Sequence, residues 1–219
     1  MELIGRTLGQ ALEDTAKKFP NNLAVRYTDR DYERTYRAFD DECDILARGL
    51  LNMGFKKGDH LAIWATNTPE WLLTLFAAAK IGVVTVTVNT NYKIFELEYQ
   101  LKQCDAKGVI LIDGFKDSNY VEIINSLCPE LSDCGDKTFS AHKFPFLRHV
   151  IYAGKKRTPN GMTAFSSLLD EKNLASAEKL KNAKDSLSCN DIINMQYTSG
   201  TTGFPKGVML SHYNLLNNG

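Results

Sequence analysis

The sequence predicts an α/β fold: a doubly wound, largely parallel sheet with helices on both faces. Apolar strand patterns and amphipathic helix patterns alternate along most of the chain, which is the order expected of a parallel sheet with helical crossovers. The strand patterns are near-continuous runs rich in Val, Ile and Leu, as at 83–88 and 108–112. Strands of this composition are typically covered on both faces.

The amino-terminal segment is predicted to form two helices around a short hairpin. A first helix begins after Thr7, a favourable N-cap, and its apolar side chains recur at helical spacing until Pro20 ends it. Residues 23–27 and 32–36 then form two strands around a charged turn. A second amphipathic helix covers residues 37–53 and ends before a glycine, which suits a helix C-terminus.

The remaining elements follow the strand–helix alternation. The predicted strands lie at 60–65, 83–88, 108–112, 148–152, 191–197 and 208–210, and helices at 95–104, 120–127 and 171–184, the last highly charged and solvated. Another helix has Thr68 as its cap and proline at its first position. Its predicted buried face consists of Trp71, Leu72, Leu75, Phe76 and Ala79. Residues 129–146 contain several helix and strand breakers and form the least regular stretch.

Composition indicates an ordinary globular protein. The 219 residues are 43% hydrophobic and 24% charged, so the chain can bury a sizeable core. Lys and Arg total 26, as do Asp and Glu, which gives no overall attraction to nucleic acid or to an anionic membrane. No apolar run reaches the roughly 20 residues of a transmembrane segment, and no secretory leader is visible. We expect a cytoplasmic protein without a nucleic-acid partner.

The cysteines and histidines suggest neither a metal site nor a disulfide framework. Five cysteines with irregular spacing occur at positions 43, 104, 128, 134 and 189, and an odd number without a C-x-x-C pair is a poor match to either role. We expect them to act as small buried hydrophobes. The four histidines are scattered, and His212, in the first turn of a helix capped by Ser211, is interpreted as structural.

One loop near the end of the sequence has the chemistry of a phosphate-binding site. Glycines allow the backbone to approach a ligand closely, hydroxyl and backbone N–H groups donate to phosphate oxygens, and a lysine supplies positive charge. The candidate phosphate-binding residues are Thr198, Ser199, Gly200, Thr201, Thr202, Gly203 and Lys206. By composition alone, a flexible polar turn with a solvated lysine is an equal alternative.

The loop does not fit the Walker A pattern of P-loop nucleotidases. That pattern requires Gly-x-x-x-x-Gly-Lys-Ser/Thr. Counting from Gly200 places Pro205 at the second glycine, and Gly207 follows the lysine where a hydroxyl is required. Proline lacks the backbone donor, and glycine lacks a hydroxyl for a metal ion, so the Walker reading fails.

Read as a whole, residues 197–207 closely resemble the signature loop of the adenylate-forming (AMP-binding) superfamily, whose pattern is near T-S-G-T-T-G-x-P-K-G. The flanks at 191–196 and 208–214 resemble the acyl-CoA synthetase or fatty-acyl-CoA ligase branch. Blocks within 35–107 resemble the amino-terminal part of that family in the same order, whereas 113–185 is less similar. The resemblance implies the amino-terminal part of the large domain of such an enzyme.

The resemblance also implies a reaction. A carboxylic acid, expected to be a fatty acid, would be activated with ATP and Mg²⁺ as an acyl-adenylate and then transferred to coenzyme A. The hydroxyl-bearing residues of the loop would bind phosphate oxygens, its first two glycines would permit the tight path, and Lys206 would neutralise charge. We expect residues 1–185 to form an α/β subdomain and 186–219 to add a strand, the phosphate loop and the start of the next subdomain.

The same comparison implies parts that this sequence lacks. The carboxy-terminal domain and the residues of the adenine and acyl pockets would lie beyond Gly219. No catalytic residue is assigned within the chain. We therefore expect an amino-terminal fragment that is inactive alone. The alternative is a naturally short, non-catalytic nucleotide-binding or interaction protein that kept the fold. The intact loop favours the first hypothesis, because a non-catalytic protein would be free to lose Lys206 or the threonines.

Overall fold

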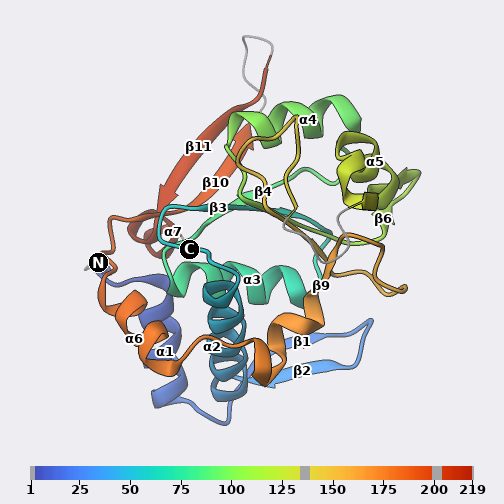
Figure 1. Cartoon of the computed structure of the whole chain (residues 1–219). Coiled ribbons are helices and arrows are strands. Elements are labelled where there is room, and N and C mark those ends of the chain that lie inside the picture. The colour runs from blue at the N-terminus through green and yellow to red at the C-terminus, as the bar shows by residue number, and fades with distance from the viewer. Residues whose placement is uncertain (1–2, 134–138, 199–203, 219) are drawn as a thin grey trace.

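The computed structural model describes residues 3–133, 139–198 and 204–218. Over these residues the chain forms a seven-stranded, mostly parallel sheet with helices on both faces (Figure 1). The predicted fold class is confirmed. Within this part of the chain, no helix combines the length and apolar character needed to cross a membrane.

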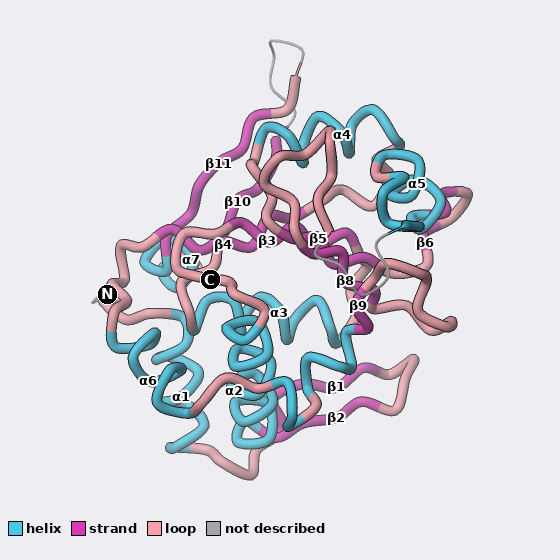
Figure 2. Tube along the Cα trace, in the orientation of Figure 1, coloured by secondary structure: helices cyan, strands magenta, loops and turns pink. Residues whose placement is uncertain are grey.

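In the main sheet, the order of the strands in space differs from their order in the sequence, because later strands are added on both sides of the first one. Its strands, from one edge to the other, are β11 (Lys206–Ser211), β10 (Ile192–Thr198), β4 (Val84–Thr87), β3 (His60–Trp64), β5 (Gly108–Leu111), β8 (His149–Tyr152) and β9 (Thr163–Ala164). All neighbouring pairs are parallel except β10 and β11, which are antiparallel. Figure 2 shows the strands of this sheet between the two groups of helices. Because β10, β4 and β3 are parallel neighbours, their carboxyl ends lie on the same side of the sheet.

Helices cover the two faces unequally. One face carries α1 (Leu8–Lys18), α2 (Tyr36–Asn52), α3 (Pro69–Lys80) and α6 (Ala177–Asp185), and the other carries α4 (Ile94–Gln103) and α5 (Tyr120–Leu127) (Figure 1). Each face has its own apolar core. The core beneath α4 includes Trp64, Val86, Leu97 and Tyr120, and the core beneath α2 and α3 includes Leu46, Leu61, Leu73 and Ile110.

Smaller elements complete the chain. They are the hairpins β1 (Leu23–Tyr27) with β2 (Tyr32–Thr35) and β6 (Gly114–Phe115) with β7 (Ser118–Asn119), the 3₁₀ helices η1 (Pro129–Asp133), η2 (Phe165–Leu169) and η3 (Glu171–Asn173), and the last helix α7 (His212–Asn217). The two described ends lie close together, because the backbone of Ile4 exchanges hydrogen bonds with the side-chain amide of Asn217.

Two helices differ from the sequence prediction. In α3 Ala79 is buried as predicted, together with Leu73, Thr74, Ala77 and Lys80. The other predicted residues, Trp71, Leu72, Leu75 and Phe76, are only partly buried. The helix contacts both β4 and the pair α1 and α2, so its small side chains lie where neighbours come closest. The charged segment 171–184 is not one solvated helix: it divides into η3 and α6, Leu180 of α6 is buried, and Lys184 forms ion pairs with other helices.

Candidate functional site

The hairpin of β10 and β11 brings the described ends of the candidate phosphate loop together. Thr198 and Lys206 are opposite each other as the outermost pair of the antiparallel ladder, and both are exposed. Among the described residues, the ammonium group of Lys206 has no hydrogen bond or ion pair. The predicted site residues Ser199, Gly200, Thr201, Thr202 and Gly203 lie outside the described residues.

Gly207 stands at a close approach within this hairpin. It pairs with Tyr197, and a Cβ atom added at Gly207 would lie 2.9 Å from Sδ of Met195 and 3.3 Å from Cζ of Tyr197. Met195 is buried in the core beneath α4, so its side chain has little room to move. Packing therefore explains the glycine that follows Lys206.

Helix α4 contacts the residues on either side of the candidate phosphate loop. The ring of Tyr99 stacks on Phe204 with centroids 5.0 Å apart, and its hydroxyl donates a hydrogen bond to the carbonyl of Pro205 at 3.3 Å. One turn later, the side-chain carbonyl of Gln103 accepts a hydrogen bond from the hydroxyl of Tyr197. Residues four apart lie on one helix face, so this face of α4 contacts β10 and the two residues that precede β11.

The base of the hairpin is fixed by polar contacts to other parts of the fold. Asp191, just before β10, forms an ion pair of 2.6 Å with Lys57 and accepts at its backbone carbonyl from the N–H of His212. His212 is fully buried, and its Nδ1 accepts from the backbone N–H of Leu8 at 3.0 Å. Burial lowers the pKa of His212 to about 4, despite the opposing effect of the Asp191 carboxylate. His212 thus stabilises the fold as a neutral imidazole.

The loop after β4 is anchored from two neighbouring elements. The indole of buried Trp64 donates to the carbonyl of Asn89 at 3.2 Å, and the hydroxyl of Tyr120 donates to the carbonyl of Thr90 at 2.6 Å. The two rings are stacked, with centroids 3.6 Å apart. The side-chain oxygen of Asn89 accepts from the N–H of Asn91, so turn formation accounts for Asn89.

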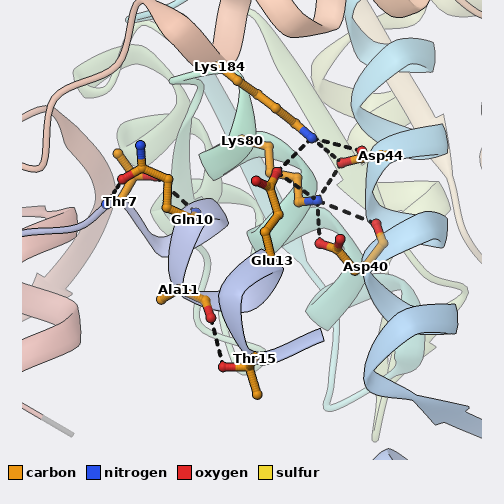
Figure 3. Close-up of polar contacts among 9 residues, drawn as sticks. All are labelled: Thr7, Gln10, Ala11, Glu13, Thr15, Asp40, Asp44, Lys80 and Lys184. Atoms are coloured by element: carbon orange, nitrogen blue, oxygen red, sulfur yellow. Dashed lines mark hydrogen bonds and ion pairs between the residues drawn. The ribbon is translucent and has the colours of Figure 1, made fainter. Parts of the chain in front are cut away.

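A wide, open cavity of about 790 Å³ lies elsewhere, between α1, α2, α3 and α6. It contains a network of charged residues, which Figure 3 shows in close-up. The ammonium of Lys80 bonds Asp40 at 2.5 Å and also bonds Asp44, and Lys184 contacts Glu13 at 2.7 Å and Asp44 at 2.8 Å. Oxygens of the three acidic residues lie within 4.8 Å of one another. Lys80 and Lys184 between them contact all three carboxylates, so the geometry is that of an ion-pair network.

Three of the four described cysteines have the surroundings of small buried hydrophobes. Cys43, Cys104 and Cys128 are buried free thiols, and Cys189 is half-buried. Burial raises the pKa of Cys104 and of Cys128 to about 12, so neither is a reactive thiolate at neutral pH. Cys134 lies outside the described residues.

The chain belongs to the AMP-binding enzyme family, whose model matches residues 12–219. It is 48% identical over 217 residues to YngI of Bacillus subtilis (strain 168), which is provisionally named an acyl-CoA synthetase; the match covers 99% of this chain and 39% of that protein. It is 36% identical to the human mitochondrial medium-chain acyl-CoA ligase ACSF2, over 99% of this chain and 35% of that protein. The chain therefore spans 35–39% of the length of these relatives.

Solved structures agree on the fold. The crystal structure of the anthranilate CoA ligase AuaEII in complex with anthranoyl-AMP superposes with a TM-score of 0.74 at 24% identity, covering 97% of this chain and 36% of that one. At this identity the similarity supports the fold alone.

The sequence predicted the loop as a candidate site but did not predict the residues that contact its flanks. Tyr99, Gln103 and Tyr197 contact one another or the loop flank, yet none was predicted as a site residue. A polar pair four residues apart on a predicted helix was a signal for Tyr99 and Gln103. Its partner could not be read from the sequence, because α4 and the hairpin are about a hundred residues apart in the chain.

Proposed function

We propose that this chain supplies the ATP-phosphate loop, and the α/β layer that supports it, of an AMP-forming acyl-CoA synthetase, an acid–thiol ligase. One observation carries the proposal. The run Thr-Ser-Gly-Thr-Thr-Gly-Phe-Pro-Lys-Gly starts on the last residue of β10 and ends in β11, and the ladder brings Thr198 and Lys206 opposite each other. Membership of the AMP-binding family and the names of the two relatives support the same reaction class.

The proposed reaction has two steps. A carboxylate oxygen attacks the α-phosphorus of ATP, a P–O bond forms and pyrophosphate leaves; the thiol of coenzyme A then attacks the acyl carbonyl and AMP leaves. Catalysis of the first step depends on positioning and on stabilising phosphate charge. The part we assign to this chain is to bind the β- and γ-phosphates through the hydroxyl and N–H groups of the loop and the ammonium of Lys206.

Mg²⁺ enters this scheme with ATP as part of the substrate. The described flanks of the loop, Thr198 and residues 204–207, offer a hydroxyl and an ammonium but no carboxylate. Such a donor set suits phosphate oxygens rather than a hard cation, which prefers carboxylate oxygens. We therefore assign no metal-binding role to these residues.

The acid is proposed to be a fatty acid. The name of the human relative specifies medium-chain acids, and residues of the acyl and adenine pockets are proposed to lie outside this chain. The division into parts at 1–185 and 186–219 stays a prediction. A cytoplasmic location also stays a prediction, because the human relative is named as a mitochondrial protein.

The test separates phosphate binding from catalysis. We expect the 219-residue chain to bind ATP in equilibrium titrations, and Lys206→Ala to weaken binding about tenfold or more, because a charge-assisted hydrogen bond to phosphate contributes roughly 1.5–3 kcal/mol. Lys181→Ala is the matched control, since Lys181 is an exposed lysine of α6 whose ion pair is with Asp185, exposed as well. Equal binding by the two variants would contradict the assigned role of Lys206.

Catalysis is tested by carboxylate-dependent exchange of pyrophosphate into ATP. We expect none from the chain alone, because the catalytic partners of the loop are proposed to lie elsewhere. Robust exchange by the purified chain would overturn that proposal. The alternative of a naturally short, non-catalytic nucleotide-binding protein is separated by the reading frame of the gene, which we expect to continue beyond codon 219.

A further inference from the structure

We propose that Tyr99 is a positioning residue for ATP, which holds the Phe204–Lys206 flank of the phosphate loop against α4. The inference rests on the proposed phosphate-binding function of the loop. It adds a residue that is remote in sequence and whose hydroxyl bonds the Pro205 carbonyl.

The first support is the double contact that Tyr99 makes. Its ring lies 5.0 Å from that of Phe204 with the planes 26° apart, which is a stacked arrangement. Its hydroxyl also donates to the carbonyl of Pro205 at 3.3 Å. One side chain therefore contacts two consecutive residues immediately before Lys206.

The second support is the geometry of the peptide that follows. In a trans peptide the carbonyl of one residue and the N–H of the next lie in one plane and point in opposite directions. A hydrogen bond to the Pro205 carbonyl therefore orients the Pro205–Lys206 peptide and, with it, the direction in which Lys206 leaves the backbone. Proline also fixes its own φ angle, so little freedom is left at this joint.

The third support is that burial in the core does not explain the position of Phe204. Its side chain is 68% exposed, so burial in the core does not hold it. Gln103, on the same face of α4, bonds the hydroxyl of Tyr197 on the other strand of the hairpin. Helix α4 thus contacts both flanks of the loop, and Tyr99 contacts the flank that carries Lys206.

The experiment compares ATP binding by the 219-residue chain and by variants at the stack. Tyr99→Leu removes both contacts, Tyr99→Phe removes only the hydroxyl, and Phe204→Leu removes the partner ring. Phe95→Leu is the matched control, because Phe95 is an aromatic residue of the same helix that is 81% exposed. Aromatic pairs contribute enough to change an equilibrium several-fold.

We expect Tyr99→Leu and Phe204→Leu each to weaken ATP binding about fivefold and Tyr99→Phe about twofold. The double variant Tyr99→Leu with Phe204→Leu should bind no more weakly than either single variant, because the two residues act as a unit. Unfolding midpoints should match the wild type, since the stack is at the surface. A purely structural role for Tyr99 would shift the midpoint and would not couple to Phe204 in ATP binding.

The outcomes distinguish the two proposals. If Lys206→Ala weakens ATP binding and Tyr99→Leu does not, or if the losses at Tyr99 and Phe204 simply add, the role of Tyr99 is overturned and the phosphate function stands. If neither Lys206→Ala nor Tyr99→Leu changes ATP binding, or the wild-type chain binds no ATP, both proposals fail.

Discussion

Nδ1 of His212 accepts a hydrogen bond of 3.0 Å from the backbone N–H of Leu8, which joins the first residue of α7 to the first residue of α1. The N–H groups of a first helical turn have no partner within their own helix. A buried imidazole satisfies one of them here, and it does so from a position 204 residues away in the chain. Only a neutral imidazole can accept at this nitrogen.

The first prediction concerns the stability of the fold at low pH. Burial lowers the pKa of both His212 and His149 to about 4, whereas an unfolded histidine titrates near 6.5. Between these values the unfolded chain binds more protons than the folded chain, so the free energy of unfolding rises with pH. Stability from these two residues should be complete above about pH 6.5 and should fall as pH decreases toward 4.

Each histidine can contribute up to about 3 kcal/mol to this change. The measurement is urea unfolding from pH 7.5 to pH 4.5 for the wild type and for His212→Asn, which keeps a possible acceptor but does not titrate. The two histidines make the free energy of unfolding depend on pH. We expect His212→Asn to lose about half of this pH dependence, and His149 to account for the rest. An unchanged profile would show that His212 does not titrate as its burial requires.

The second prediction concerns Lys80, whose side chain is 1% exposed. Burial by itself would lower its pKa, but Asp44 and Asp40 outweigh that effect and raise it, so Lys80 is charged at neutral pH. Lys80→Met leaves the two carboxylates without this partner. Because they are 17% and 34% exposed and Lys184 still contacts Asp44, we expect a loss of about 2 kcal/mol rather than the 3–5 of a fully buried pair.

Urea unfolding at pH 7 measures this loss. Lys181→Met is the control, because its ion pair with Asp185 is exposed on both sides, and such pairs contribute little. We expect that change to stay within about 0.5 kcal/mol of the wild type. Equal losses of unfolding free energy in Lys80→Met and Lys181→Met would contradict the view that burial makes the ion pairs of Lys80 important for stability.

The sequence predicted the elements well wherever local chemistry determines them. Thr7 caps α1, Thr68 caps α3 with proline next to it, and Ser211 caps α7, each through its own side chain. Strand composition likewise indicated a covered, parallel sheet. These features depend on neighbours in the sequence, so they can be read from it.

The contacts that support the site depend on tertiary structure and could not be read in the same way. The position of Tyr99 against Phe204 requires α4 to pack beside β10, and the register of strands fixes which residues of each meet. The predicted buried face of α3 was right at Ala79 and wrong at the four larger residues for the same reason: hydrophobic size pointed to Trp71 and Phe76, whereas packing between two layers selected the small Ala77 and its neighbours.

The last prediction concerns Tyr120, which anchors the loop after β4. Tyr120→Phe keeps the ring on Trp64 but removes the donor to the Thr90 carbonyl, and an unsatisfied buried acceptor costs about 1–2 kcal/mol. Tyr120→Leu also loses the stacked ring, so we expect about 3 kcal/mol in total. Tyr92→Phe is the control, because the structure shows no hydrogen bond from the hydroxyl of half-buried Tyr92 among the described residues. Unfolding followed by tryptophan fluorescence measures all three, and a Tyr120→Phe variant as stable as Tyr92→Phe would mean that the hydrogen bond from Tyr120 does not help to hold this loop.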